Sequence, residues 1–304
     1  MIIYDTIIIG AGPAGLTAAI YAARRAMKTL MIGEEVGGQI NKTFTIENYP
    51  GIKTIGGGEL ALNAGNQVKE LGVEIITGRV NKITKENNLF IISEKETGAT
   101  YQAKTLILSF GLKKRQLGLL GEEKFDGHGL SYCVNCDGPL FKNKTVAVVG
   151  GGNSGAEAVE FLAKICPTVY WLEIMPDLKA DPVLIQQIRQ LNNVKIFIQT
   201  KITALKGDPW LTNIVVDHEG QTETLTVQGI FVEIGYIAET DWLKGVVELD
   251  NAGQIKVDAL GSTNVPGIFA AGDVTNSKHK QIVVASGAGA IAALEAYEYL
   301  RKQN

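Results

Sequence analysis

Two cysteines separated by two residues are the clearest candidates for chemistry in this sequence. Cys133 and Cys136 lie in the segment SYCVNCDGPL, and Asp137 directly follows the second cysteine. Thiols at this spacing can close a small-ring disulfide, and neighbouring groups can lower a thiol pKa. A carboxyl group there could pass a proton to or from a leaving thiolate. The segment therefore predicts a redox-active pair on a short exposed turn, because Gly138 and Pro139 end any longer helix.

Two other uses of this cysteine pair are open at this point. It could be half of a metal site, which would need His128 and a further ligand, or a second chain, to complete tetrahedral coordination. It could also be two unreactive structural thiols, although a cysteine beside Asp, Gly and Pro is an unusual core residue. The third cysteine, Cys166, precedes Pro167 at the end of a predicted helix, and we expect it to be a buried helix residue.

A repeated strand, glycine turn and helix indicates two nucleotide sites. Residues 5–35 and 144–174 each contain a β-branched strand, the pattern G-x-G-x-x-G, an Ala-rich helix and a second apolar strand. In such a turn the first glycine allows the tight bend, the second lets the backbone approach a pyrophosphate, and the third lets the helix pack on the strand. The glycines of the two turns are Gly10, Gly12, Gly15, Gly150, Gly152 and Gly155.

Two dinucleotide sites in one chain predict electron transfer between a tightly held flavin and a nicotinamide. The N-terminus of each helix offers free N–H groups and a positive dipole end to the phosphates. The cofactors would supply the hydride and electron chemistry, and the protein would position them.

Later segments complete the expected framework. Residues 226–235 and 267–274 each predict a buried strand that ends in glycine, and residues 282–300 predict an Ala/Gly-rich helix. Asp273 at a strand end is well placed to bond a polyol hydroxyl, although a helix-cap or turn role would also fit. Residues 70–104 predict short alternating strands that form a meander.

The duplication predicts an α/β fold with two Rossmann-like domains, doubly wound and three-layered, one inserted into the other. We expect an FAD-binding domain from residues 1–114 and 243–304, and an NAD(P)H-binding domain from residues 115–242 that carries the redox pair. Residues 113–115 and 240–243 are the candidate crossings between them.

Composition excludes several other classes of protein. The chain has 304 residues, 45% of them apolar and 20% charged, and a net charge of −3, which gives no electrostatic footprint for nucleic acid or an anionic membrane. Three cysteines exclude a disulfide-stapled secreted scaffold, and no apolar run reaches the ~20 residues of a membrane helix. We therefore expect a cytoplasmic location. Glycine is in excess, with 35 residues, as expected for tight turns and close backbone approaches around nucleotides.

Six motifs resemble low-molecular-weight thioredoxin reductases over essentially the whole chain. From Cys133 onward the sequence is most similar to the flavoprotein component of alkyl hydroperoxide reductase. The motifs are GAGPAG at residues 10–15, GGQ at 37–39, ENYPG at 47–51, CVNCDG at 133–138, GGGNSG at 150–155, and AAGDV at 270–274 with KQI at 280–282.

This resemblance implies a homodimeric FAD enzyme in which the nicotinamide reduces FAD, FAD reduces the disulfide, and the dithiol reduces a thioredoxin- or glutaredoxin-like protein. By position, Cys136 would face the flavin, Cys133 would attack the disulfide of the partner protein, and Asp137 would donate a proton. The sequence departs from the family with Lys280 in place of arginine and with Phe110 before Gly111.

The resemblance also implies the residues that contact each cofactor. Those expected at FAD are Gly10, Gly12, Pro13, Ala14, Gly15, Glu34, Gly38, Gln39, Asn48, Gly111, Gly272, Asp273, Lys280, Gln281 and Ile282. Those expected at the nicotinamide nucleotide are Gly150, Gly152, Asn153, Ser154, Gly155 and Glu173.

Glu173 favours NADH over NADPH. Family members that use NADPH have a His-Arg-Arg cluster where this chain has Glu173, Ile174 and Met175. Glu173 follows the second glycine turn at about the spacing of an acidic residue that bonds a ribose 2′-hydroxyl, and its charge would repel a 2′-phosphate. Two alternatives remain: the same flavoenzyme supplied by ferredoxin or another donor, and a non-enzymatic nucleotide-binding redox sensor.

Overall fold

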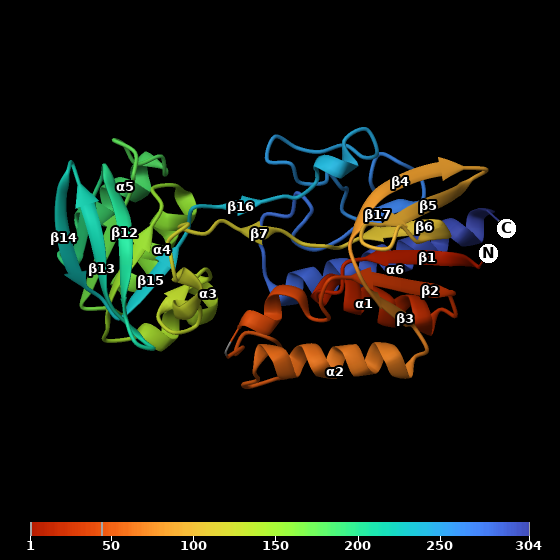
Figure 1. Ribbon diagram of the computed structural model, residues 1–304, viewed down its shortest axis with the longest axis horizontal. Coiled ribbons are helices and arrows are strands. Elements are labelled where there is room, and N and C mark those ends of the chain that lie inside the picture. The colour runs from red at the N-terminus through yellow and green to blue at the C-terminus, as the bar shows by residue number, and fades with distance from the viewer. Residues whose placement is uncertain (1, 44, 304) are drawn as a thin grey trace. The chain divides into compact units, whose positions relative to one another are not determined.

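The computed structural model describes residues 2–43 and 45–303, and the chain divides into two compact units (Figure 1). The first comprises residues 1–113 and 237–304, and the second comprises residues 114–236. The crossing segments β7 (Lys113–Lys114) and β16 (Tyr236–Ile237) pair with each other as a two-stranded sheet.

The chain therefore returns to the first unit between residues 236 and 237, before the boundary that we expected at residues 242/243. The 3₁₀ turn Asp241–Leu243 belongs to the first unit, because Leu243 is fully buried in that unit's core with Val247 and Ile255. Burial of this leucine, which the sequence pattern did not identify, holds the segment in place.

The first unit is built on a seven-stranded sheet in the order β3-β2-β1-β6-β5-β4, with β17 also paired to β6. Strands β1, β2, β3, β6 and β17 are parallel neighbours, whereas β4, β5 and β6 are antiparallel, so only those three form the expected meander. The strands are β1 (Ile3–Ile9), β2 (Thr29–Gly33), β3 (Glu74–Thr77), β4 (Val80–Glu86), β5 (Leu89–Glu94), β6 (Thr100–Leu108) and β17 (Ile268–Ala270).

Alternating side chains along β1 explain why the strand ends in three consecutive isoleucines. Ile7 and Ile9 enter one hydrophobic core, while Ile8 enters a second core on the opposite face, packed against helix residues. The helices of this unit are α1 (Pro13–Arg24), α2 (Gly57–Glu70) and α6 (Ile282–Gln303), with the 3₁₀ turn Gly38–Lys42 between β2 and α2.

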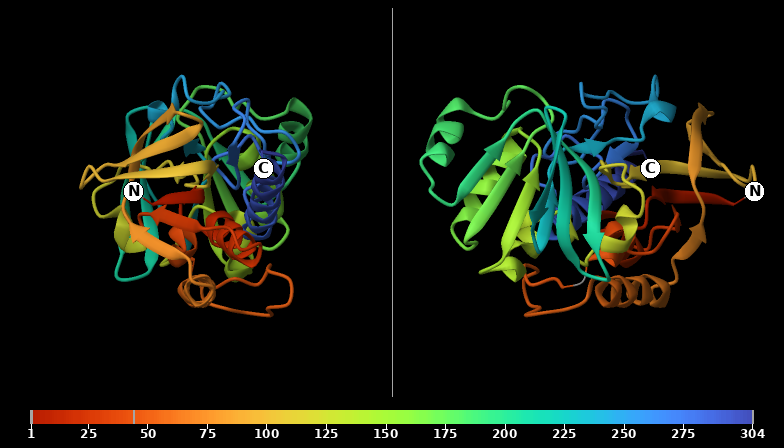
Figure 2. Two further views of the ribbon diagram at one scale, coloured as in Figure 1. Left: turned by 90° about the vertical axis from the view of Figure 1, so that its right-hand side faces the viewer. Right: turned by 60° about the vertical axis from the view of Figure 1, so that its left-hand side comes forward.

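The second unit has a five-stranded parallel sheet in the order β11-β10-β9-β15-β8 and a separate antiparallel sheet, β12-β13-β14 (Figure 2). Val146 and Val148 of β9 face one core and Ala147 faces another, as in the first unit. The strands are β8 (Leu130–Ser131), β9 (Thr145–Val149), β10 (Thr168–Leu172), β11 (Val194–Phe197), β12 (Thr200–Gly207), β13 (Leu211–His218), β14 (Gln221–Thr226) and β15 (Gly229–Val232).

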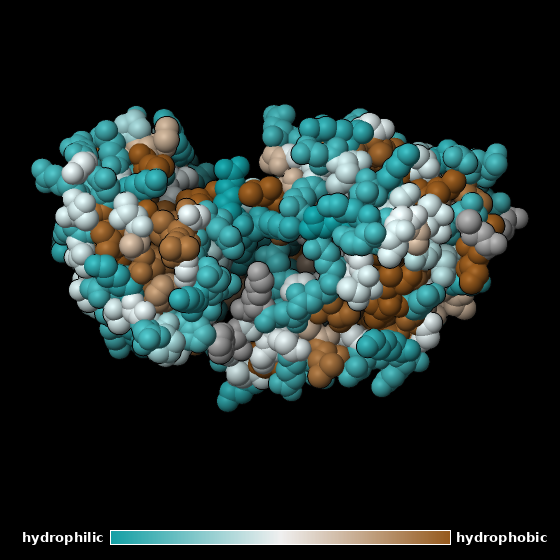
Figure 3. Space-filling view, in the orientation of Figure 1, coloured by the Kyte–Doolittle hydropathy of each residue, from teal (hydrophilic) through white to brown (hydrophobic). Residues whose placement is uncertain are grey.

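Three helices and two 3₁₀ turns complete the second unit. They are α3 (Val134–Asp137), α4 (Asn153–Ala163), α5 (Pro182–Arg189) and the turns Glu122–Phe125 and Gly138–Phe141. The fold is thus the expected mixed α/β arrangement of two Rossmann-like units, with the second inserted into the first in sequence. Exposed apolar residues lie among hydrophilic ones on each unit (Figure 3), as on most folded proteins.

Within the described residues, no helix combines the length and the apolar character that crossing a bilayer demands.

Candidate active site

Cys133 and Cys136 form a disulfide at the short helix α3. Cys133 is the residue before the first turn, and its carbonyl accepts hydrogen bonds from the backbone N–H groups of Cys136 and Asp137 at 3.2 and 3.0 Å. Both cysteines are half-buried rather than on an exposed turn, because Val134 between them is anchored in the hydrophobic core. The helix ends at the 3₁₀ turn that contains Pro139.

Asp137 lies beside this disulfide and is held by Ser131. The Ser131 hydroxyl donates to Asp137 Oδ2 at 2.6 Å, and its oxygen accepts the N–H of Cys133 at 3.1 Å. Burial raises the pKa of the Asp137 carboxyl, while the Ser131 hydrogen bond and the charge of Lys114 oppose that rise. A carboxyl group with a raised pKa keeps a proton at a higher pH than an exposed aspartate, as a proton donor requires.

The second glycine turn joins β9 to α4 in the same unit. Gly150 has φ +123°, and a Cβ there would meet the backbone carbonyl of Glu233, so this position requires glycine. A Cβ at Gly155 would meet the carbonyl of Gly150 where helix and strand pack. Gly152, in contrast, has open space where a Cβ would lie. Open space at the middle glycine is what close approach of a pyrophosphate needs.

Glu173 follows β10 and contacts this turn directly. Its carboxylate accepts the backbone N–H of Gly151 and that of Met175, the second at 2.8 Å. The residues after it, Ile174 and Met175, are exposed and apolar. An acidic residue at the glycine loop, followed by two apolar residues, is the arrangement that the sequence predicts for a ribose with a free 2′-hydroxyl.

Asn153 and Ser154 open helix α4 and are both exposed. Asn153 Oδ1 accepts the backbone N–H of Asp181 at 2.8 Å, which ties the start of α4 to the start of α5. Ser154 lies in the first turn, where backbone N–H groups have no partner within the helix.

The first glycine turn repeats this geometry between β1 and α1. Gly10 has φ +111°, and a Cβ there would meet the Ser109 carbonyl, whereas a Cβ at Gly12 would have only one neighbour, at 4.0 Å. Gly15 packs against the carbonyl of Gly10. Pro13 is in the first turn of α1, where its missing N–H costs no hydrogen bond. Ala14 is buried, and its carbonyl lies close enough to Gly289 of α6 to exclude a Cβ there.

Glu34 lies just beyond β2 and forms an ion pair with Arg79. The Arg79 Nε and Nη2 atoms each lie 2.8 Å from Glu34 Oε1, and Arg79 Nη2 lies 3.4 Å from Glu239. Lys113 pairs with the same Glu239 at 2.9 Å. The sequence reasoning missed Arg79, which lies in a segment with no nucleotide motif.

Gln39 connects the 3₁₀ turn that begins at Gly38 with the loop after β6. Its side-chain Nε2 donates to the carbonyl of Leu112. Gly111 has φ +72°, and a Cβ there would lie 3.8 Å from the same amide. The expected FAD residues Gly38, Gln39 and Gly111 are therefore brought together.

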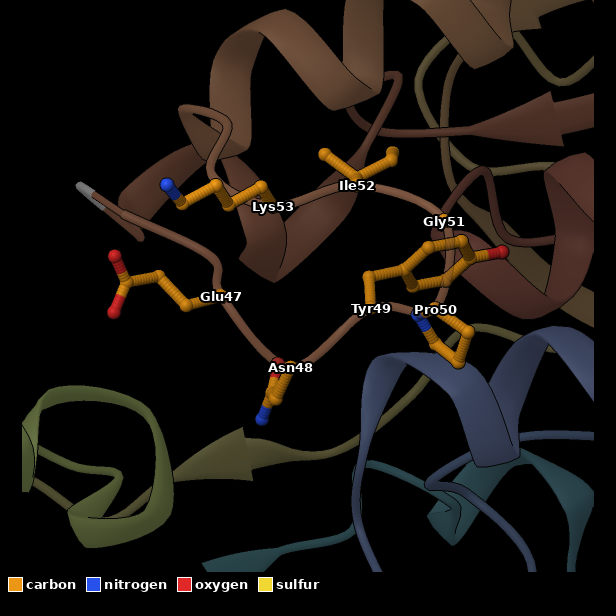
Figure 4. Close-up of a pocket in the computed structure, with 7 residues that line it drawn as sticks. All are labelled: Glu47, Asn48, Tyr49, Pro50, Gly51, Ile52 and Lys53. Carbon is orange, nitrogen blue, oxygen red and sulfur yellow. The ribbon is translucent and has the colours of Figure 1, made fainter.

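Asn48 lies on the loop of residues 47–53, which lines an open pocket with its own side chains (Figure 4). Its Nδ2 donates to Gln281 Oε1 at 3.2 Å, so two expected cofactor residues that are far apart in sequence touch. Gln281 directly precedes α6, whose first residue is Ile282.

Lys280 binds the backbone of the segment that follows strand β17, where Gly272 and Asp273 lie. Its ammonium group donates to the carbonyls of Asp273 and Thr275 at 2.9 and 2.8 Å and to Gln254 Oε1 at 3.1 Å. Burial lowers the pKa of Lys280, opposed by the charges of Asp273 and Asp250. Gly272 has φ +77°, which allows the bend that precedes Asp273. Lysine thus provides a structural anchor at the position where the resemblance implies arginine.

Cys166 is buried, as expected, but it lies beyond α4 rather than within it. Helix α4 ends at Ala163, and the Cys166 thiol donates to the carbonyl of Phe141 at 3.2 Å. Burial raises its pKa to about 11, so this thiol is unreactive at neutral pH.

Sequence reasoning also missed two polar residues near the helix that carries the disulfide, Ser131 and Lys114. The Ser131 hydroxyl holds Asp137, and the Lys114 ammonium group lies 5.6 Å from the centre of the Tyr132 ring. Neither residue carried a signal of its own, since serine is common in turns and Lys114 was considered only as part of a crossing between domains.

Comparison with known proteins decides the family. A model of the family described as "Pyridine nucleotide-disulphide oxidoreductase" matches residues 4–289. The chain belongs to this family. The thioredoxin reductase of Streptococcus pyogenes superposes with a TM-score of 0.93 at 36% identity and covers 99% of both chains. The thioredoxin reductase of Giardia duodenalis gives 0.93 at 32% identity, covering 99% of this chain and 100% of its own.

The relatives that are similar to this chain in sequence have two different names. "NADH dehydrogenase" of Bacillus subtilis is 43% identical over 98% of this chain, and one component of the alkyl hydroperoxide reductase of Staphylococcus epidermidis is 42% identical over 98%. The chain spans only 58% and 59% of those two proteins. The resemblances noted in the sequence to thioredoxin reductases and to an alkyl hydroperoxide reductase component are thereby confirmed.

Proposed function

We propose that this chain is an FAD-dependent, thioredoxin reductase-like enzyme. It passes electrons from NADH through FAD and the Cys133–Cys136 disulfide to a thioredoxin- or glutaredoxin-like protein. One observation carries the proposal: a formed disulfide, with Asp137 beside it, belongs to the same compact unit as a complete nucleotide-type glycine turn. The thioredoxin reductases that superpose on the whole chain support the same interpretation.

The residues of both glycine turns fit dinucleotides. A Cβ at Gly152 would meet open space and a Cβ at Gly12 would make only one ordinary contact, at 4.0 Å, whereas packing alone requires the glycines on either side. The middle glycines therefore leave room that the fold itself does not use. FAD, when bound, supplies two-electron chemistry between hydride donors and disulfides. Gly12 and the start of α1 would hold its pyrophosphate, and Asp273 and Glu34 would accept hydrogen bonds from its hydroxyl groups.

The thiols exchange with the partner protein in a balanced step. The Cys133 thiolate attacks one sulfur of the partner's disulfide, which forms a mixed disulfide and releases the other partner sulfur as a thiolate. Cys136 then attacks Cys133, which releases the reduced partner and restores the Cys133–Cys136 bond. Asp137 supplies a proton to a leaving thiolate and recovers it from solvent.

Glu173 supports NADH as the donor. Its carboxylate lies at the Gly151 backbone, where an additional phosphate would meet negative charge, and the next two residues are apolar and exposed. The name "NADH dehydrogenase" of one relative agrees with this assignment. We further propose a cytoplasmic homodimer, on the same family resemblance.

Anaerobic titration of the purified protein tests the proposal. We expect a yellow protein with about one FAD per chain, whose flavin absorbance is bleached by NADH at lower concentration than by NADPH. Bleaching by dithionite but by neither nucleotide would contradict the nicotinamide assignment and favour ferredoxin or another donor. A colourless protein that takes up no FAD would contradict the flavoenzyme itself and favour a redox sensor.

A further inference from the structure

Four charged side chains form a connected network in the first compact unit. Arg79 joins two carboxylates: its Nε and Nη2 atoms each lie 2.8 Å from Glu34 Oε1, and Nη2 lies 3.4 Å from Glu239 Oε2. Lys113 in turn contacts both oxygens of Glu239, at 3.0 and 2.9 Å. All four residues belong to the first unit, and the sign of the charge alternates along the network from Glu34 to Lys113.

The backbone brings Arg79 to the end of strand β2. Arg79 lies between β3 and β4, and the N–H of the preceding Gly78 donates to the carbonyl of Gly33, the last residue of β2, at 3.1 Å. The carbonyl of Arg79 accepts the N–H of Lys95 at 2.7 Å, and its own N–H lies 3.4 Å from Oε1 of the buried Glu94. These contacts fix the backbone of Arg79 beside the end of β2, so the position of its guanidinium does not depend on the ion pairs alone.

Arg79 occupies only one oxygen of the Glu34 carboxylate. Both contacting nitrogen atoms approach Oε1, and across residues 2–43 and 45–303 no hydrogen bond or ion pair reaches Glu34 Oε2. The Glu34 side chain is 60% exposed, whereas the Arg79 side chain is 33% exposed. A carboxylate at this place in a Rossmann unit is the usual acceptor for a ribose hydroxyl. The geometry therefore leaves Oε2 for that hydrogen bond.

We propose that Arg79 is a positioning residue for the adenosine half of FAD, which holds Glu34 Oε1 so that Oε2 accepts a hydrogen bond from a ribose hydroxyl. The proposal deepens the function proposed above and rests on its assignment of FAD to the first glycine turn. Arg79 itself needs no contact with the nucleotide, because its effect reaches FAD through Glu34.

The physical basis of this role is pre-organisation of the Glu34 side chain. A free glutamate side chain on a protein surface samples several rotamers and loses that freedom when it binds a ligand. Because Arg79 restrains Glu34 before the nucleotide arrives, part of this entropy is already lost in the free protein. Exposed ion pairs contribute little to the free energy of folding, so we expect the pair to affect FAD binding more than stability.

Glu239 and Lys113 keep Arg79 available to Glu34. Glu239 gives the guanidinium a second carboxylate, which restricts its motion when no nucleotide is bound. The Oε2 atom of Glu239 is 2.9 Å from Lys113 but 3.4 Å from Arg79. Lys113 therefore compensates much of the charge of Glu239, and the guanidinium remains closest to Glu34.

The test is the dissociation constant of FAD from the full-length protein. The FAD-loaded protein is diluted in steps, and the free FAD is separated by ultrafiltration and measured by its fluorescence. Arg79→Met removes the hydrogen-bond donors but keeps an unbranched side chain. We expect it to bind FAD about 3- to 10-fold more weakly, which is the cost of ordering one long side chain. Arg79→Lys keeps the charge, so its constant should lie between those of wild type and Arg79→Met, and it replaces Arg79→Met in the comparison if that variant does not fold.

Two comparisons separate this effect from a general loss of structure. Lys104→Met breaks the ion pair between Lys104 and Asp5, which is also partly exposed, has a length of 2.8 Å and belongs to the same unit. This control should leave the FAD dissociation constant unchanged. Glu34→Ala has no carboxylate to position, so adding Arg79→Met to it should change the constant by less than about twofold.

Unchanged or tighter FAD binding in Arg79→Met, or an equal loss of affinity in the Glu34→Ala background, would overturn the proposal when circular dichroism shows the variants to be folded. The measurement needs neither a nicotinamide nor the cysteines. Failure of NADH to reduce the flavin would therefore contradict the proposed electron donor without affecting the role of Arg79. A wild-type protein that binds no FAD would overturn both the proposed flavoenzyme and this role.

Discussion

Ser131 and Asp137 are joined by a 2.6 Å hydrogen bond across the base of the redox helix. The same serine oxygen accepts the N–H of Cys133, so a single hydroxyl orients both the proton donor and one of the thiol-bearing residues. A hydrogen bond from a hydroxyl favours the charged form of a carboxylate, whereas burial favours the neutral form. Burial and the Ser131 hydrogen bond therefore act in opposite directions on the pKa of the Asp137 carboxyl.

Asp137→Asn should slow transfer of electrons from the dithiol to a thioredoxin-like substrate by about 10²- to 10⁴-fold, the usual contribution of a general acid. Flavin reduction by the donor should be unaffected, because that step precedes the disulfide. Rapid-mixing measurements of each half-reaction check the prediction, and equal losses in both would contradict it.

The pH profile gives a second prediction about the same pair. A donor is active while protonated, so activity falls as pH rises through the Asp137 pKa. Ser131→Ala removes a hydrogen bond that lowers this pKa, so the fall should move to higher pH. Ser131→Thr, which keeps the hydroxyl, serves as the control. A shift to lower pH in the alanine variant would show that another group controls the profile.

The sequence alone was enough to predict the two glycine turns and the cysteine pair, because their residues recur at fixed spacings. The two glycine turns, the strands before them and the Cys133–Cys136 pair follow from local patterns, because tight turns and small-ring disulfides impose residue types over a few positions. Ser131 and Lys114 could not be found in this way. Ser131 is close to the cysteines in sequence, but its hydrogen bonds to Asp137 and Cys133 exist only in the folded turn. Lys114 is 18 residues before Tyr132, over whose ring its ammonium group lies.

The point at which the chain returns to the first unit also could not be predicted exactly from local sequence patterns. A boundary at residues 242/243 follows from the point where the duplicated unit is complete in sequence, but burial of Leu243 assigns residues 237–242 to the first unit. Burial of a single leucine in a distant core is a property of the folded chain, which no local pattern reveals.

The two thiols should be distinguishable in the flavin spectrum. Cys133→Ser leaves Cys136 as a thiolate beside oxidised flavin, so a long-wavelength charge-transfer band should appear. Cys136→Ser should show no such band and should abolish transfer from flavin to the disulfide while flavin reduction by the donor survives. If the band appeared in the Cys136 variant instead, the assignment of the two thiols would be reversed.

The glycines of the turns should separate into two classes. Gly12 and Gly152 have ordinary negative φ angles, and a Cβ would make one contact at 4.0 Å at Gly12 and none at Gly152, so Gly12→Ala and Gly152→Ala should fold normally. We expect Gly12→Ala to lose bound FAD and Gly152→Ala to weaken nicotinamide binding, because a methyl group would occupy the place of a pyrophosphate. Flavin content and titration with NADH measure these effects.

Gly155→Ala is the matched contrast to these two variants. Its methyl group would meet the Gly150 carbonyl, and such overpacking costs roughly 1–3 kcal/mol of unfolding free energy. Chemical denaturation should therefore show a loss of stability in Gly155→Ala but not in Gly152→Ala. Equal stability of the two would mean that the helix can move away from the strand.

Glu173 should control the choice of nucleotide. Its carboxylate lies on the Gly151 backbone, and the nearest following cation in the sequence is Lys179, whereas a 2′-phosphate is best held by an arginine fork. We expect NADH to reduce the flavin about 10- to 100-fold more efficiently than NADPH, equivalent to about 1.4–2.8 kcal/mol.

Replacing Glu173, Ile174 and Met175 by His, Arg and Arg should move the preference towards NADPH, because it removes the repulsion and supplies the attraction. Glu173→Gln alone should reduce the discrimination without reversing it. Stopped-flow flavin reduction at low nucleotide concentration measures both, and equal rates with the two nucleotides in wild type would show that Glu173 does not contact the ribose.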